Sequence, residues 1–340
     1  MADKISVSKK TGTFKEVSNM KRIGILTSGG DAPGMNAAIR AAVRSALSFG
    51  LEVYGIERGY EGLIHGQIER LESRSVSDMI QRGGTFLKTA RSEEFKTEEG
   101  QRKAADELEA YGIDGLIVIG GDGSFHGAKI LSEKFGIKCM GIPGTIDNDL
   151  AYTDYTLGFD TAVNTVLTAI NNLRDTMQSH DRVSLIEVMG RSCGDIALYA
   201  GVAGGAEYIL IPEKPYDLDE IAKSLIKSKL RGKTSNMIVL AEGAGDRDQI
   251  VSYLMEKAGV DIKMTHLGHV QRGGSPTMAD RILASRFAVR AVKELMDENS
   301  VPAAIGIKGN EVVAVPFEEV FNTPKTFDEE LYNIAQILGK

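Results

Sequence analysis

The sequence predicts an α/β protein in which parallel strands alternate with helices. Four short apolar runs each stop abruptly at a polar turn that contains glycine: residues 23–26, 116–119, 183–188 and 237–240. Continuous apolar runs of this length between helical patterns are typical of strands buried in a parallel sheet. A chain of 340 residues is long for one hydrophobic core, so two domains are expected. Ligands of such sheets bind beyond the carboxyl ends of the strands, where the polar turns lie.

The sequence also indicates where several helices begin and end. Pro33 suits the first turn of a helix that Gly50 ends. A second helix begins at residues 97–99 and ends at Gly112. Residues 217–220 place an aspartate at a helix N-cap and a glutamate three positions later, which is close to a capping box. Residues 1–19 match no element and are expected to form a mobile tail.

Composition limits the partners of the protein. Its 42% hydrophobic and 26% charged residues are ordinary for a globular protein. The formal net charge of −7 argues against nucleic acid or an anionic membrane as a partner. No apolar run approaches the length of a membrane span. Two cysteines, Cys139 and Cys193, make neither a disulfide framework nor a metal knuckle, so we expect a cytoplasmic protein.

The most informative segment is 143–149, with the sequence PGTIDND. Asp147 and Asp149 stand two apart directly after an apolar run, and in an extended segment they would point to the same side. Two like charges that close together are costly unless a metal or a reaction uses them. An Asp/Asn-rich surface turn is the alternative for such a motif taken alone.

Two glycine-rich turns, residues 29–34 and 120–124, each join a strand to a helix. Backbone N–H groups and the helix dipole can then meet an anion such as a phosphate. Asp122 adds a carboxylate suited to Mg²⁺, which prefers oxygen ligands. Neither turn is a Walker A loop or a G-x-G-x-x-G motif. Tight packing of helix on sheet is the alternative explanation for either turn taken singly.

Several basic residues accompany these turns: Arg91, Arg182, Arg191, His269 and Arg272. A solvated surface arginine is the usual explanation for each one. Two of them, Arg191 and Arg272, adjoin glycines at the ends of strands or loops, where a guanidinium can reach a phosphate with two hydrogen bonds.

The motifs PGTIDND, GGDAPG, GGDGS, MGR and GHVQRGG together resemble those of the bacterial ATP-dependent 6-phosphofructokinases, from about residue 20 to the C-terminus. The resemblance implies two Rossmann-like three-layer α/β domains with mostly parallel sheets. An ATP-binding domain would comprise 20–158 and 271–321, and a sugar-phosphate domain 159–270 and 322–340, with 1–19 as a tail outside the family. It also implies a homotetramer that phosphorylates fructose 6-phosphate at its 1-hydroxyl with ATP and Mg²⁺, the committed step of glycolysis.

By the same resemblance, Asp147 is the base that takes the proton of the sugar hydroxyl. The residues around the transferring phosphoryl group would be Thr145, Asp149, Arg91 and Arg191. Asp122 would hold Mg²⁺, and the nucleotide would be bound by Gly30, Arg91, Ser92, Gly121, Asp122, Gly123 and Ser124. Fructose 6-phosphate would be bound by Thr145, Ile146, Asp147, Arg182 of a neighbouring subunit, Met189, Gly190, Arg191, Glu242, Lys263, His269, Val270, Gln271 and Arg272.

Two glycines indicate the phosphoryl donor. The family's pyrophosphate-using members typically carry Asp and Lys where this chain has Gly123 and Gly144. A glycine leaves room for the α-phosphate of ATP, which a carboxylate would crowd and repel. The chain departs from the family at Lys263, where an arginine for the substrate phosphate is usual.

The resemblance also implies an effector site for ADP or phosphoenolpyruvate between subunits, formed by Arg40, Arg44, Arg174, Glu207, Arg231 and Lys233. One family arginine is displaced there, since Ser73 takes its position and Arg74 the next. Arg40 and Arg44 indicate an anion site independently of the resemblance, because they lie i,i+4 on one predicted helix without an acid nearby in sequence. An external anion would offset their mutual repulsion.

Three alternatives stay open at this point. The protein could use pyrophosphate, phosphorylate another sugar phosphate, or bind nucleotide as a sensor without turnover. The pair Asp147 and Asp149 favours an enzyme, because binding alone needs no base beside the phosphoryl site.

Overall fold

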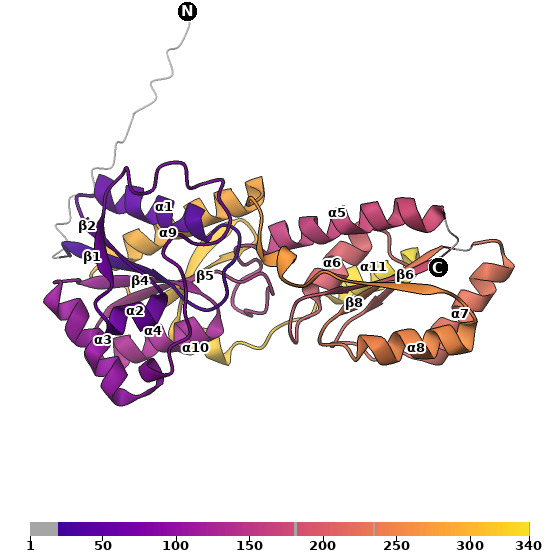
Figure 1. Cartoon of the computed structure of the whole chain (residues 1–340). Coiled ribbons are helices and arrows are strands. Elements are labelled where there is room, and N and C mark those ends of the chain that lie inside the picture. The colour runs from indigo at the N-terminus through magenta and orange to yellow at the C-terminus, as the bar shows by residue number, and fades with distance from the viewer. Residues whose placement is uncertain (1–19, 180–181, 234, 340) are drawn as a thin grey trace, which may run out of the picture.

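Two α/β bodies lie side by side in a computed structural model of the chain (Figure 1), which describes residues 20–179, 182–233 and 235–339. The predicted tail, 1–19, lies outside the described residues. The first body contains a seven-stranded sheet in the order β11-β10-β5-β4-β1-β2-β3. Its strands are β1 Arg22–Thr27, β2 Glu52–Ile56, β3 Ile68–Leu71, β4 Gly115–Gly120, β5 Lys138–Pro143, β10 Ala303–Lys308 and β11 Glu311–Pro316. The pairs β2–β3 and β10–β11 at the two edges are antiparallel, and the pairs between them are parallel.

Helices cover both faces of this sheet. On one face, α1 (Met35–Ser48) packs against α9 (Met278–Met296), and both appear above the sheet in Figure 1. The opposite face carries α2 (Gly59–Ile64), α3 (Glu98–Ala110), α4 (Asp122–Phe135) and α10 (Phe317–Asn322). Successive side chains of a strand point to opposite faces. Ile25 accordingly joins the core under α1, while Leu26 joins the core on the other side.

The second body is smaller and all of its strand pairs are parallel, in the order β7-β8-β6-β9. The strands are β6 Val183–Val188, β7 Tyr208–Leu210, β8 Asn236–Ala241 and β9 Ile262–His266. One face is covered by α5 (Phe159–Gln178), α6 (Asp195–Ala203) and α11 (Glu329–Leu338), and the other by α7 (Leu218–Leu230) and α8 (Arg247–Ala258).

The chain passes between the two bodies three times: between β5 and α5, through the 3₁₀ turn η2 (Gly268–Arg272) into α9, and between α10 and α11. Asp280 of α9 stabilises the start of α5, where the first crossing ends. Its buried carboxylate accepts hydrogen bonds from Gly158 N and Thr161 N, each at 2.9 Å. These crossings are compatible with the predicted division into domains, which stays a prediction.

Most of the predicted elements are present in the structure. The four apolar runs are the parallel strands β1, β4, β6 and β8, and Thr97 and Asp217 are side-chain N-caps of α3 and α7. One expectation was wrong in detail. Helix α1 begins at Met35 with Gly34 as its N-cap, so Pro33 precedes the helix rather than standing in its first turn.

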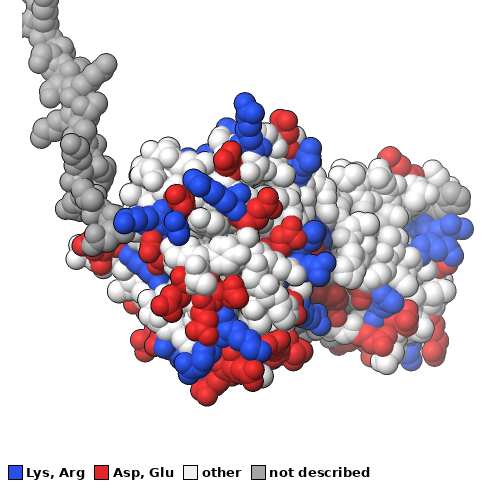
Figure 2. Space-filling view, turned by 60° about the vertical axis from the view of Figure 1, so that its left-hand side comes forward, with Lys and Arg blue, Asp and Glu red and all other residues white. Residues whose placement is uncertain are grey.

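The surface of the first body is mixed in charge. On the face shown in Figure 2, Lys and Arg side chains are interspersed with Asp and Glu. Among the described residues, no helix combines the length and apolar character that a membrane crossing requires.

Candidate active site

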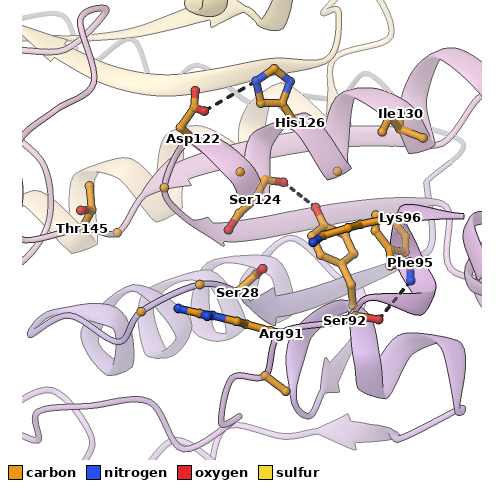
Figure 3. Close-up of a pocket in the computed structure, with 18 of the residues that line it drawn as sticks. Ser28, Arg91, Ser92, Phe95, Lys96, Asp122, Ser124, His126, Ile130 and Thr145 are labelled. Atoms are coloured by element: carbon orange, nitrogen blue, oxygen red, sulfur yellow. Dashed lines mark hydrogen bonds and ion pairs between the residues drawn. The ribbon is translucent and has the colours of Figure 1, made fainter. Parts of the chain in front are cut away.

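A cavity of about 520 Å³ lies beyond the carboxyl ends of β1, β4 and β5, facing the turn that follows β6 (Figure 3). Strands β1, β4 and β5 are neighbours in one parallel sheet, so the turns that follow them meet at one edge. Eleven of the predicted site residues line this cavity: Gly30, Arg91, Ser92, Gly121, Asp122, Gly123, Ser124, Thr145, Asp149, Arg191 and Arg272.

Two glycines of the glycine-rich turns have no room for a side chain in the arrangement seen. A Cβ on Gly30 would lie 2.0 Å from Arg272 Nη1, and a Cβ on Gly120 would lie 2.4 Å from Ser28 O. Gly123 differs, because a Cβ there meets no atom within 4 Å and would point into open space. Helix α4 begins in this turn with Gly121 as an N-cap that provides no side-chain hydrogen bond. Its first N–H groups are thus available to an anion in the cavity.

Asp147 sits beside this cavity with a side chain that is 1% exposed. Neither carboxylate oxygen accepts a hydrogen bond from a described residue. Arg191 Nε lies 3.3 Å from Oδ2 as an ion pair. The loop is held by Thr145, whose Oγ1 accepts from Asp147 N at 3.2 Å.

The expected extended backbone of this loop was wrong, because Asn148 has a φ of 52° in the left-handed region. The charge of Asp149 nevertheless acts on Asp147. Burial raises the pKa of Asp147, and the charge of Asp149 raises it further, while Arg191 and Arg272 oppose the shift. Burial also raises the pKa of Asp149. A carboxylate whose pKa moves toward neutrality is better suited to accept a proton from a substrate.

The turn after β6 presents Arg191 in an unusual backbone conformation, with φ values of 139° at Gly190 and 53° at Arg191. Glu242, which follows β8, stabilises this turn because its Oε1 accepts hydrogen bonds from Gly190 N at 3.2 Å and Arg191 N at 2.8 Å. Gln271 Oε1 accepts from Met189 N at 3.1 Å. Two residues predicted to bind substrate therefore also support the turn that carries Arg191.

Arg182 and Lys263 lie at the opposite end of the second sheet. Arg182 precedes β6, and Lys263 is paired in register with Ser184. Both are ion-paired with Asp261, each at 3.1 Å. The length of β6 separates them from Arg191 by roughly 20 Å. One chain therefore does not bring them to the same ligand as Arg191.

The remaining predicted residues lie close to the cavity but do not line it. Ile146 is buried beside Asp147, while His269 and Val270 are exposed on η2 next to Arg272. His269 and Val270 are thus free to contact a ligand from the side of the second body.

Asp122 is the acid best placed for a cation in the cavity. Its side chain is 60% exposed, and His126 Nε2 lies 3.6 Å from Oδ2 (Figure 3). A second group of possible ligands comprises Cys193, Asp195 and Glu213, but a lysine ammonium already lies 3.0 Å from Asp195. We therefore place a candidate metal site at Asp122.

The outer end of the cavity was not predicted from the sequence. Figure 3 shows Phe95, Lys96, His126 and Ile130 along this end. His126 stacks on Phe321 of α10, with ring centroids 3.8 Å apart. The only sequence signal for this group was the spacing of His126 and Ile130, which lie four and eight residues after Asp122 on one helix.

The predicted effector residues are not brought together. Arg40 and Arg44 are on α1 of the first body, and the others are on the second, far from α1 in Figure 1. Arg174 donates to the carbonyl oxygens of Gly204 and Gly205. Glu207 is ion-paired with Lys233 at 2.9 Å, and Arg231 follows α7. Among the described residues, neither arginine of α1 has a hydrogen-bond or ion-pair partner.

Fold and cavity together define an α/β protein with a cavity at a helix N-terminus and a buried carboxylate beside it. Comparison with known proteins identifies the family. The family described as "Phosphofructokinase" matches residues 22–295, and the chain belongs to it.

Curated relatives are similar over nearly the whole chain. A protein of Clostridium botulinum (strain Loch Maree / Type A3) is 60% identical over 321 residues, which is 94% of this chain and 100% of the relative. A protein of Clostridium tetani (strain Massachusetts / E88) is 60% identical over 320 residues, with the same coverage. Both are named ATP-dependent 6-phosphofructokinase.

Solved structures agree with the fold. A phosphofructokinase from Saccharomyces cerevisiae has a TM-score of 0.84 and 36% identity, covering 94% of this chain and 48% of that one. This chain thus spans about half the length of the yeast protein. A pyrophosphate-dependent phosphofructokinase from Marinobacter aquaeolei has a TM-score of 0.82 and covers 94% of this chain and 91% of that one. At 20% identity, that likeness concerns the fold alone.

Proposed function

We propose that the protein transfers the γ-phosphoryl group of ATP to the 1-hydroxyl of fructose 6-phosphate, the committed step of glycolysis. The observation that carries this proposal is Asp147, a buried carboxylate without a hydrogen-bond partner among the described residues, which is ion-paired with Arg191 beside a cavity lined by a helix N-terminus. Relatives at 60% identity with the name ATP-dependent 6-phosphofructokinase support it.

The nucleotide phosphates lie along the glycine turns. Backbone N–H groups of Gly121, Asp122 and Gly123 bind them at the N-terminus of α4, and Gly30 lies on the facing wall. Arg91 and Ser92 close the cavity from the long loop before α3. The adenosine part extends toward His126 and Ile130, where the lining is partly apolar.

Asp122 fits a magnesium ion, because its carboxylate is exposed to the cavity and has only a distant histidine beside it. When bound, Mg²⁺ neutralises charge on the phosphates.

The chemical step uses the buried acid. Asp147 accepts the proton of the 1-hydroxyl as its oxygen bonds to the γ-phosphorus, and the bond from that phosphorus to the bridging oxygen breaks to release ADP. Burial and Asp149 make Asp147 a stronger base than an exposed aspartate. Thr145, Arg91 and Arg191 surround the transferring group, and their role is positioning and charge stabilisation.

The sugar phosphate is bound by residues from more than one chain. Met189, Gly190, Glu242, His269, Val270, Gln271 and Arg272 contact it from the chain that carries Asp147. Arg182 and Lys263 serve the site of a neighbouring subunit, because about 20 Å of strand separates them from Arg191 in their own chain. We therefore propose a homotetramer with active sites shared across subunit faces.

The same assembly would complete an effector site. Arg40 and Arg44 of one subunit would meet Arg174, Glu207, Arg231 and Lys233 of another and bind ADP or phosphoenolpyruvate. Arg40 and Arg44 support this, since neither has a partner among the described residues. We place the enzyme in the cytoplasm, consistent with the two free, buried thiols, Cys139 and Cys193.

ATP is the donor in this proposal. Gly123 has open space at its Cβ position, whereas a Cβ added at Gly144 would lie 2.9 Å from Met35 Cε. A carboxylate at Gly123 would project toward the nucleotide phosphates, and its Cβ would meet no atom within 4 Å.

A coupled assay with fructose 6-phosphate and Mg²⁺ tests the proposal by comparing ATP with pyrophosphate. Turnover with ATP and negligible turnover with pyrophosphate are expected. Comparable kcat/KM for both donors would contradict the choice of donor, and ATP binding without turnover would instead favour a nucleotide sensor.

A further inference from the structure

The segment between α10 and α11 carries a lysine that reaches the back of the acidic loop. Lys325 Nζ donates to Asn148 O at 2.5 Å and lies 3.0 Å from Asp195 Oδ2. Asn148 stands between Asp147 and Asp149 in the sequence. The ammonium therefore binds the backbone of the residue that separates the two acids. Lys325 does not line the cavity. Its charge opposes the rise that burial causes in the pKa of Asp149, so Lys325 can act on the reaction through this charge as well as through the position of the loop.

The side chain of Asn148 is fixed by the same cluster. Its Nδ2 donates to Asp195 Oδ2 at 2.9 Å, and its Oδ1 accepts from Thr156 N at 3.1 Å. Asn148 is buried and holds a left-handed backbone conformation, with a φ of 52°. Such a conformation persists only where surrounding contacts impose it. The contacts of Asp195 and Lys325 supply that constraint.

The cluster also joins the two bodies of the molecule. Asn148 belongs to the loop after β5 of the first body, and Asp195 is in the first turn of α6 in the second. Lys325 comes from the crossing segment that runs between the bodies in Figure 1. One ammonium group thus ties together the base-bearing loop, the second body and the crossing segment.

We infer that Lys325, together with Asp195, is a positioning residue for phosphoryl transfer: it fixes the Asp147–Asp149 loop against α6. This inference rests on the proposed function. Asp195 carries a buried carboxylate that needs a cation, and Asn148 O needs a donor, so one lysine satisfies both groups. A neutral side chain at position 325 would leave the Asp195 carboxylate without a cation and remove the ammonium donor from Asn148 O, so the loop would relax.

The test is the steady-state kinetics of Lys325→Met in the full-length enzyme. Since a misplacement of about 1 Å can cost about 100-fold in rate, kcat should fall by about that factor. KM for ATP should change little, because Gly121–Ser124 and Arg91 are untouched. Lys325→Arg keeps the charge and both contacts, so it should recover most of kcat.

Lys214→Met is the matched control. Lys214 Nζ lies 2.5 Å from Glu329 and 5.2 Å from the centre of the Phe327 ring, so it fastens the same C-terminal segment without touching the loop. Its kcat should stay at the wild-type value. An equal loss of kcat in Lys214→Met would overturn the inference, because general docking of the C-terminus would then explain the effect.

Asp195→Asn completes the test if Lys325→Met does not fold. Asp195→Asn should lower kcat. The double variant with Lys325→Arg should have the same kcat as Asp195→Asn alone, since the two substitutions act through one contact. Wild-type kcat in Lys325→Met or in Asp195→Asn would overturn the inference. A wild-type enzyme without turnover would instead defeat the proposed function, so the two failures are distinguishable.

Discussion

The cavity beyond β4 and the basic residues of α1 are both candidate phosphate sites, but they differ in what one chain provides. At the cavity, the turns after β1, β4, β5 and β6 bring a carboxylate, guanidinium groups and a helix N-terminus together. At α1, two arginines stand alone, while their proposed partners lie on the other body. Under the proposed function, one chain would provide the first site except for its sugar-phosphate end, and only half of the second site.

The difference has a topological cause. Turns that follow neighbouring parallel strands must meet at one edge of the sheet, so their side chains converge without further help. A side chain on the outer face of a helix has no such constraint. It can complete a site only against another surface, which for Arg40 and Arg44 would be a second subunit.

Replacing the base should have the largest effect at the complete site. Asp147→Ser should lower kcat by about 10²–10⁴-fold, because loss of a general base typically costs that much. KM values for both substrates should change little, since the phosphate-binding groups remain. Steady-state kinetics measures both constants. Asp106→Ser, at an exposed acid on α3, is the control, and a near-wild-type kcat in Asp147→Ser would remove Asp147 from the mechanism.

A new charge at Gly123 tests the nucleotide end of the same site. Gly123→Asp should raise KM for ATP about 100-fold, since like charges brought together cost several kcal/mol. The fold should tolerate the side chain, because a Cβ there meets no atom within 4 Å. Gly123→Asn has nearly the same size without the charge and should retain most ATP use. Equal KM values for the two variants would show that crowding, not charge, decides the donor.

The sequence predicted one of these regions better than the other for the same topological reason. Strands that end in glycine turns are readable as motifs, so Gly30, Asp122 and Asp147 could be placed at one edge of a sheet from the sequence alone. The left-handed conformation at Asn148 could not be predicted, because contacts from Asp195 and Lys325, far apart in sequence, impose it. The second role of Glu242, holding the Arg191 turn, likewise depends on tertiary contact.

Lys263 tests whether the sugar-phosphate end needs a second subunit. Lys263→Ala should raise KM for fructose 6-phosphate about 10-fold, the worth of one hydrogen bond to a charged group, and leave KM for ATP unchanged. Equal changes in both constants would argue against a role specific to the sugar phosphate.

Subunit mixing makes this test sharper. Coexpressed Asp147→Ser and Lys263→Ala chains should form hybrids in which one site of each mixed pair keeps both residues. A two-fold interface is reciprocal, so each mixed pair has one intact site and one site that lacks both residues. Because about half of the pairs are mixed when chains pair at random, about a quarter of the wild-type activity should return at low fructose 6-phosphate. Activity equal to the average of the two variants would place Lys263 in its own chain's site.

Arg44 tests the incomplete site on α1. ADP or phosphoenolpyruvate should alter the saturation curve for fructose 6-phosphate, and Arg44→Ala should weaken the apparent effector affinity about 10-fold, within the usual range of coupling energies. Maximal kcat should not change. Arg102→Ala, at an exposed arginine on α3, is the control. Calorimetry that detects neither effector, with the active site blocked, would contradict the site.

The smallest expected effect is on the free energy of unfolding, which should respond to a substitution at Asp147 but not to one at Arg44. Burial raises the pKa of Asp147 above its ordinary value of 3.8, so ionisation of this group destabilises the folded state. The penalty is absent below pH 3.8, grows as the pH rises toward the raised pKa, and is complete above it. Asp147→Asn should therefore increase the free energy of unfolding at pH 7 by about 1 kcal/mol, as substitutions in strained active sites commonly do.

This gain should disappear as the pH falls below about 4, where the wild-type carboxyl is protonated in both states. Thermal unfolding at fixed protein concentration, followed from pH 7 to pH 4, measures it. Arg44→Ala, at an exposed position, should shift stability by less than about 0.5 kcal/mol at every pH. A stabilisation by Asp147→Asn that persists undiminished at pH 4 would mean that the packing of the side chain, rather than its buried charge, lowers the stability of the wild-type protein.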